Sequence, residues 1–136
     1  MKRVGRYVMA AALASLVVAP VAAAERTPTM SRAEAKMITR NTIIDRLHYS
    51  ASDAGVLIRM IDCRRRSRVR FFCDWLAGGD TQAREGRGTV GWSGLDGRGN
   101  PRLSYTFVGE IRRIVYTDPP TSRIIRRFTW RLRVRP

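Results

Sequence analysis

The stretch "CRRRSRVRFFC", from Cys63 to Cys73, places five arginines between two cysteines and decides how the second half of the chain folds. Its continuation "RVRFFCDWL" (68–76) alternates with a period of two, and the apolar phase contains Val69, Phe71, Cys73 and Trp75. That period is typical of a β-strand with one buried face. The stretch therefore predicts a β-hairpin in which each strand carries one cysteine.

The two cysteines predict a disulfide across this hairpin. Direct opposition of Cys63 and Cys73 brings their Cβ atoms close enough to bond and places the turn near 67–69. A turn at 65–66 would instead offset the cysteines, and the sequence leaves both registers open. A bridge over a loop of this length stabilises the fold by about 2.5–3 kcal/mol in the chain-entropy description. A redox-active pair is the third interpretation, although that chemistry favours C-x-x-C spacing.

One helix is expected before the hairpin, over residues 31–48. Ser31 and Glu34 have the spacing of a capping box, which satisfies free amide groups at a helix start. The apolar face of this helix is expected to contain Ala33, Met37, Ile44 and Leu47. Residues 49–55 contain turn-type side chains and are interpreted as a linker.

The rest of the chain predicts strands joined by short connections. Strands are expected over 56–63, 68–76, 89–93, 102–116 and 123–135, with a polar loop over 77–88. In the fourth strand, one phase contains Leu103, Tyr105, Phe107, Ile111 and Val115. The last strand alternates most clearly, and its inward phase contains Phe128, Trp130, Leu132 and Val134.

This order of elements predicts an α+β fold, with one N-terminal helix packed on a curved antiparallel sheet of about five strands. Over residues 31–135 the order resembles the cystatin-like architecture, in which a curved antiparallel sheet cradles an N-terminal helix. It is also similar to small secreted proteins of that build that carry a close cysteine pair after the helix. Cystatin inhibitors have a Gln-x-Val-x-Gly segment in their first hairpin. This sequence lacks that segment, so the resemblance implies the fold and does not extend to protease inhibition.

The N-terminus "MKRVGRYVMAAALASLVVAPVAAAER" predicts export. Three basic residues precede an apolar run over 8–21, and three alanines ending at Ala24 form a cleavage site. An uncleaved anchor is the alternative, because the run is near the lower length limit of a spanning helix. The expected organisation is a signal peptide over 1–24, a flexible lead-in over 25–30 and a single α+β domain over 31–136.

The exported domain is strongly basic. The chain has 26 Lys+Arg and 11 Asp+Glu; loss of three cations with the leader leaves 23 against 11, a net charge of +12. Such a charge attracts polyanions. Nucleic acid is not expected outside the cell, so the expected partner is an anionic cell-envelope polymer, a lipid head group or an acidic protein. After signal cleavage no transmembrane span is expected. A solvated arginine surface without a partner is the alternative.

Two groups of arginines are candidate anion-binding sites, because guanidinium groups fork onto carboxylates and phosphates. The first belongs to the hairpin and contains Arg64, Arg65, Arg66, Arg68 and Arg70. The second belongs to the last strand and contains Arg127, Arg131, Arg133 and Arg135, which Arg113 joins in one register only. Solvated arginines, or a row that discourages edge-to-edge pairing, are the alternatives. Phe72 shares the arginine phase and is either exposed or covered by Arg68 and Arg70.

Catalytic patterns are weak in this sequence. The single histidine, His48, lies at the predicted helix end and is interpreted as a cap or surface residue. "GRGTVG" (86–91) matches a dinucleotide pattern but opens a strand, and in "GWSGL" (91–95) Leu95 replaces the glycine of a nucleophile elbow. No enzyme activity, metal or cofactor is expected. The first hypothesis is a non-enzymatic domain that associates with anionic envelope material; the alternatives are an interaction or inhibitor module using hairpin loops, and a small hydrolase.

Overall fold

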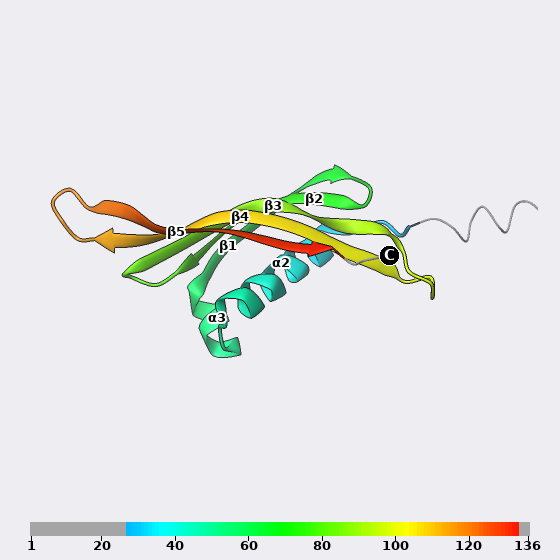
Figure 1. The fold of residues 1–136 in the computed structure, drawn as a ribbon. Coiled ribbons are helices and arrows are strands. Elements are labelled where there is room, and N and C mark those ends of the chain that lie inside the picture. The colour runs from blue at the N-terminus through cyan, green and yellow to red at the C-terminus, as the bar shows by residue number, and fades with distance from the viewer. Residues whose placement is uncertain (1–26, 134–136) are drawn as a thin grey trace, which may run out of the picture.

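A computed structural model describes residues 27–133, which form two helices and one open antiparallel sheet of five strands. The elements are α2 (Arg32–Leu47), α3 (Ala51–Leu57), β1 (Ile58–Ser67), β2 (Arg70–Gly78), β3 (Gln82–Leu95), β4 (Pro101–Val115) and β5 (Thr121–Arg133). Each strand pairs with the next along the chain, in the order β1-β2-β3-β4-β5. The helices lie against one face of the curved sheet (Figure 1). The predicted α+β class is confirmed.

Some of the sequence predictions lie outside the described residues. They are the signal peptide over 1–24, the start of the lead-in at 25–26, the inward position of Val134 and the candidate site residue Arg135. The helix predicted over 31–48 is confirmed as α2, but its description as N-terminal needs a correction, because the described helices occupy residues 32–57 rather than the N-terminus of the chain.

The capping box predicted at the start of α2 is confirmed. The Ser31 hydroxyl accepts a hydrogen bond from the Glu34 N–H at 3.0 Å, and the Ser31 N–H donates to the Glu34 carboxylate at 3.1 Å. These two bonds satisfy amide groups that have no partner within the helix. At the other end, His48 adopts a left-handed conformation with φ 55°, and its N–H donates to the carbonyl of Ile44.

The predicted apolar face of α2 is largely wrong. Met37 is 56% exposed, and the buried residues are instead Ala35, Thr39, Thr42 and Ile43. The two threonine hydroxyls donate to the carbonyls four residues earlier, each at 2.8 Å. Their polar atoms are thereby satisfied within the helix, so both threonines can face the core at little cost. The prediction considered only hydrophobic residues and therefore assigned the buried face of α2 to the wrong side of the helix.

The linker predicted over 49–55 is also wrong, because α3 occupies most of it. The Ser50 hydroxyl accepts a hydrogen bond from the Asp53 N–H at 3.1 Å and caps the helix. Serine and aspartate are common in turns, but the same side chains favour helix N-termini. Ala54 is the buried residue of this short helix.

Strand β3 is much longer than the sequence indicates, since the predicted loop over 77–88 belongs mostly to β2 and β3. Gly86 and Gly88 lie within β3, and glycine weakens strand predictions. Packing requires glycine at position 86, because a Cβ there would collide with the indole ring of Trp75. Glu85 and Arg87 alternate with these glycines and occupy the opposite face.

The core lies between the helices and the face of the sheet that they cover. Phe71, Cys73 and Trp75 of β2 are buried there, and Trp130 of β5 is nearly so, as the two strand patterns predict. The Trp75 ring stacks on Trp130 at 5.4 Å and on Phe128 at 5.8 Å between centroids. Helix α2 packs on β1, β2 and β3. The opposite face, here called the outer face, is not covered by either of the described helices and carries the candidate site.

Candidate anion-binding surface

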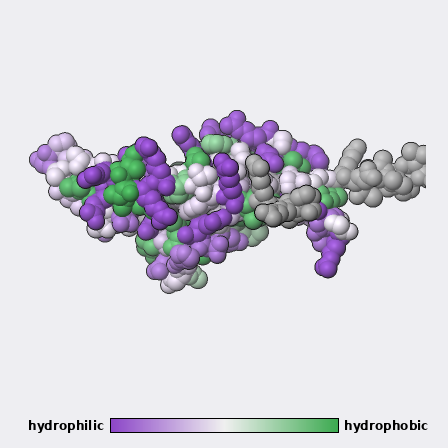
Figure 2. Space-filling model, viewed as in Figure 1, coloured by the Kyte–Doolittle hydropathy of each residue, from purple (hydrophilic) through white to green (hydrophobic). Residues whose placement is uncertain are grey.

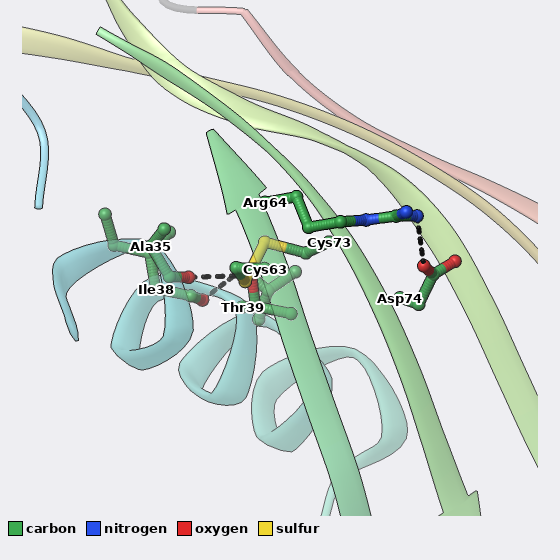
Figure 3. Close-up of a disulfide and its surroundings, with 8 residues drawn as sticks. Ala35, Ile38, Thr39, Cys63, Arg64, Cys73 and Asp74 are labelled. Atoms are coloured by element: carbon green, nitrogen blue, oxygen red, sulfur yellow. Dashed lines mark hydrogen bonds and ion pairs between the residues drawn. A yellow bond between two sulfur atoms is a disulfide. The ribbon is translucent and has the colours of Figure 1, made fainter. Parts of the chain in front are cut away.

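The cysteine pair joins β1 to β2 beneath helix α2. Cys63 and Cys73 are register partners with Cα atoms 4.1 Å apart, and they form a disulfide. Both side chains are buried, and Figure 3 shows the bond facing α2 near Ala35 and Thr39. The predicted disulfide is confirmed in the directly opposed register, with the turn at 68–69.

Two of the hairpin arginines hold the segment before α2. Arg65 donates to the carbonyl of Met30 at 2.9 Å, and its guanidinium lies 4.6 Å from the ring centroid of Phe71. Arg68 donates to the carbonyl of Thr27, and the Met30 N–H donates to the Arg68 carbonyl at 3.1 Å. Met30 is completely buried. Arg65 and Arg68 therefore attach the preceding segment to the tip of the hairpin through hydrogen bonds to backbone carbonyls.

Arg64 and Arg66 belong to the outer face. Their guanidinium carbons lie 6.0 and 5.1 Å from the ring centroid of Phe72, within the range of cation–π attraction. Arg64 also contacts the Asp74 carboxylate at 3.4 Å (Figure 3). Phe72 is half-buried, so these two arginines cover the ring rather than Arg68 and Arg70. The five hairpin arginines are thus divided by the sheet and do not form one cluster.

The strand registers place the side chains of the outer face in rows that run across the strands. Phe72 pairs with Thr89, Thr89 with Thr106, and Thr106 with Arg131. Since Arg64 pairs with Phe72, Arg64 and Arg131 end the same row, roughly 19 Å apart at the usual strand spacing. Arginines that the sequence assigns to two separate groups therefore share one face.

Arg87 is a member of this surface that the sequence interpretation missed. It lies on β3 between Asp74 of β2 and Val108 of β4, and its side chain is exposed. Arg70 has the same phase as Phe72, and its stem crosses Gly91. The alternation of Glu85, Arg87 and Thr89 is a strand pattern that could have indicated this position, but the glycines between them obscure it. We call the following set the cationic strip: Arg64, Arg66, Arg70, Arg87 and Arg131.

Arg127 belongs instead to a charge network at the other end of the outer face. Its guanidinium lies 3.6 Å from the Glu110 carboxylate, and Arg112 contacts Glu110 at 2.8 Å and Glu85 at 3.2 Å. The hydrogen bond to Glu110 raises the pKa of Arg112 above its ordinary value. Arg127 therefore has a carboxylate partner within the protein, whereas Arg131 is in ion-pair contact with none among residues 27–133.

A groove of about 790 Å³ lies on the outer face beside the strip. Its floor is partly apolar, with Met60, Leu76 and Val108, and its walls carry both charge signs. Two pairs of carboxylates face one another across strands, Asp62 with Asp74 and Glu85 with Glu110. These pairs could not be predicted from the sequence, because their members are distant along the chain. No cluster of three or more metal-ligating side chains occurs within residues 27–133.

The remaining candidates do not join the strip. Arg113 pairs with Arg123 and, as the neighbour of the outer-facing Arg112, belongs to the opposite face. Arg133 ends β5, where its backbone pairs with Ser104. His48 is used as the C-cap of α2, and the GRGTVG segment lies inside β3.

No known family model matches this chain, and comparisons with curated proteins and with solved structures gave no match either. Within the described part of the chain, neither helix is long and apolar enough to cross a membrane.

Proposed function

We propose that this protein is an exported, non-enzymatic domain that binds an anionic polymer of the cell envelope through the cationic strip. The main support is that most of these arginines have no carboxylate partner within the described residues. Among residues 27–133, Arg64 is the only strip member in ion-pair contact with a carboxylate, and Arg66, Arg70, Arg87 and Arg131 have none. Their fixed positions on a sheet make them available to an external anion.

The shape of the strip favours an extended polyanion over a small anion. Its guanidinium groups come from four strands and are spread across the sheet rather than aimed at one point. Thr89 and Thr106 lie between them and offer hydroxyl groups for further hydrogen bonds. A polymer with repeated phosphate or carboxylate groups can contact several arginines in succession, and each contact releases counterions.

Export and the cystatin-like arrangement are parts of the same proposal. The buried disulfide supports export, since such bonds persist mainly in oxidising compartments. The cystatin-like assignment is supported by a helix resting on a curved antiparallel sheet (Figure 1). Binding rather than catalysis is favoured because Arg112 and Arg127 neutralise Glu110, and His48 serves as a helix cap.

The test is co-sedimentation of the oxidised protein with a delipidated envelope fraction, over salt concentrations from about 0.05 to 0.5 M. Binding should fall steeply with salt. The triple variant Arg66→Glu, Arg87→Glu, Arg131→Glu should bind at least tenfold more weakly, and the slope of log affinity against log salt should fall by about three, because three phosphate-type contacts are lost.

The matched control places the same charge change elsewhere. Arg32→Glu, Lys36→Glu and Arg98→Glu alter exposed side chains of α2 and of the turn before β4. This control should keep most of the binding. Equal losses in the two triple variants would mean that net charge alone carries the association, and the cationic strip would then have no specific role.

A further inference from the structure

The ends of β4 and β5 form a projecting hairpin, residues 113–126, here called the arm. β3 begins at Gln82, opposite Arg113, and the Ile114 N–H donates to the Thr81 carbonyl at 2.9 Å. Beyond that point, β4 has β5 as its strand partner and no third strand beside it within the described residues. Figure 1 shows the arm extending past the rest of the sheet, on the left of the view.

The arm exposes large apolar side chains. Val115 is 41% exposed, Tyr116 70% and Ile125 46%. Figure 2 shows a hydrophobic patch over the arm, with hydrophilic surface on both sides of it. Val115 has the phase of the buried core residues Tyr105 and Phe107, but it belongs to the arm, which extends past the helices in Figure 1. The Tyr116 hydroxyl donates to the carbonyl of Asp80, but the apolar groups of all three side chains remain exposed, which points to a contact outside the fold.

The arm also carries cations whose arrangement is unfavourable in isolation. Arg113 and Arg123 are direct register partners, and like charges placed opposite one another destabilise a sheet. Arg126 follows on the same strand, and Asp118 in the turn is the single acidic residue. None of the three arginines is in ion-pair contact with a carboxylate among residues 27–133. An anionic partner would relieve this repulsion.

We propose that the arm docks on the surface of an anionic lipid bilayer. Val115, Tyr116 and Ile125 enter the boundary between head groups and acyl chains, while Arg113, Arg123 and Arg126 bind the lipid phosphates. Tyrosine favours this interfacial depth, and arginine stems can lie along apolar surface with the charge in the head-group layer. The surface is separate from the cationic strip, so the inference does not depend on the proposed polymer binding.

Other occupants fit the arm less well. A polyanion has phosphate or carboxylate groups for the arginines but no apolar phase for Val115, Tyr116 and Ile125. A second copy of the arm offers apolar surface, but it would bring two sets of arginines together. An anionic bilayer supplies both an apolar phase and negative charge, and each arginine near its surface strengthens binding by about fivefold.

The experiment is flotation with vesicles of equal parts phosphatidylglycerol and phosphatidylcholine. The protein is purified from cells expressing the full chain, so every variant carries the same N-terminal segment. The parent should bind these vesicles and bind pure phosphatidylcholine vesicles much more weakly. Val115→Thr with Ile125→Thr keeps two β-branched side chains and should bind the mixed vesicles roughly tenfold more weakly, because apolar groups are lost from the interface.

The control variant removes exposed apolar groups elsewhere. Met37→Gln with Val56→Thr changes two helix residues that are 56% and 75% exposed, and vesicle binding should not change. Sedimentation of the same preparations with the delipidated envelope fraction separates the two proposals, since the arm variant should retain that binding. The inference is overturned if the parent fails to bind the mixed vesicles, binds neutral vesicles equally, or binds no better than the arm variant.

A second variant keeps the inference testable if the first does not fold. Arg113→Ser with Arg123→Ser removes two opposed like charges, so the sheet should not be weakened. Loss of two interfacial arginines should reduce vesicle binding about twenty-five-fold at low salt. Undiminished binding by this variant would show that the arm is not the membrane contact.

Discussion

At the scale of single residues, the atoms around Gly109 of β4 leave no room for a side chain. A Cβ at this position would collide with the Glu85 carbonyl oxygen and with the Phe128 ring. The neighbouring backbone belongs to a paired strand and has little freedom to move. Gly109→Ala should therefore lower the free energy of unfolding by about 1–3 kcal/mol, as overpacking does in other cores. Urea titration followed by tryptophan fluorescence measures this change.

Gly97 provides the matched control, because nothing lies within 4 Å of a Cβ built there. Gly97→Ala should leave stability unchanged or raise it by up to about 1 kcal/mol, since alanine restricts the unfolded chain more than glycine does. If Gly109→Ala were as stable as Gly97→Ala, the close approach of the Phe128 ring would not constrain the strand.

At the scale of elements, the disulfide is the main covalent constraint on the β1–β2 hairpin. Replacing Cys63 and Cys73 together by alanine should lower the free energy of unfolding by about 2.5–3 kcal/mol, because the unfolded chain regains the freedom of the closed loop. The comparison is between oxidised parent, reduced parent and double variant in urea. Reduced parent and double variant should agree closely. A loss below about 1 kcal/mol would contradict the chain-entropy account.

The elements that sequence patterns predicted are those with large alternating side chains. β2 and β5 place bulky residues such as Phe71, Trp75 and Trp130 on the covered face, and both strands were predicted. β3 was largely missed because glycine occupies the corresponding positions. Gly86 leaves room for the Trp75 ring of β2, and Gly88 for the backbone of β4 near Thr106. The cause therefore lies in neighbouring strands, and no local pattern in β3 reveals it.

Most residues of the candidate site could be predicted, with Arg87 the exception, but their arrangement could not. The sequence indicates that Arg64, Arg66 and Arg131 are exposed on strands. Their common face depends on the registers of four successive strand pairs, and a shift by one residue would turn a strand over. The internal roles of Arg65 and Arg68 were equally hidden, because their partners precede α2.

At the scale of the whole molecule, one face of the sheet packs against the core and the other carries the candidate site. The helices and the aromatic core use one face, while the other presents the cationic strip and the groove. A chain with 26 basic and 11 acidic residues can neutralise only part of its charge internally. The ion pairs gather around Glu110 and Asp74, so most cations of the described residues, including those of the strip and the arm, have no carboxylate partner.

This imbalance predicts a fold that salt stabilises. Repulsion among unpaired arginines, including Arg113 beside Arg123, weakens the compact state at low ionic strength, and salt screens it. Raising sodium chloride from about 0.02 to 0.3 M should increase the free energy of unfolding by about 1 kcal/mol, the value of one close like-charge pair in water. Urea is the suitable denaturant, because guanidinium is itself a salt. The triple variant Arg66→Glu, Arg87→Glu, Arg131→Glu should show a flatter response. A parent whose stability falls with salt would mean that its ion pairs outweigh the repulsion.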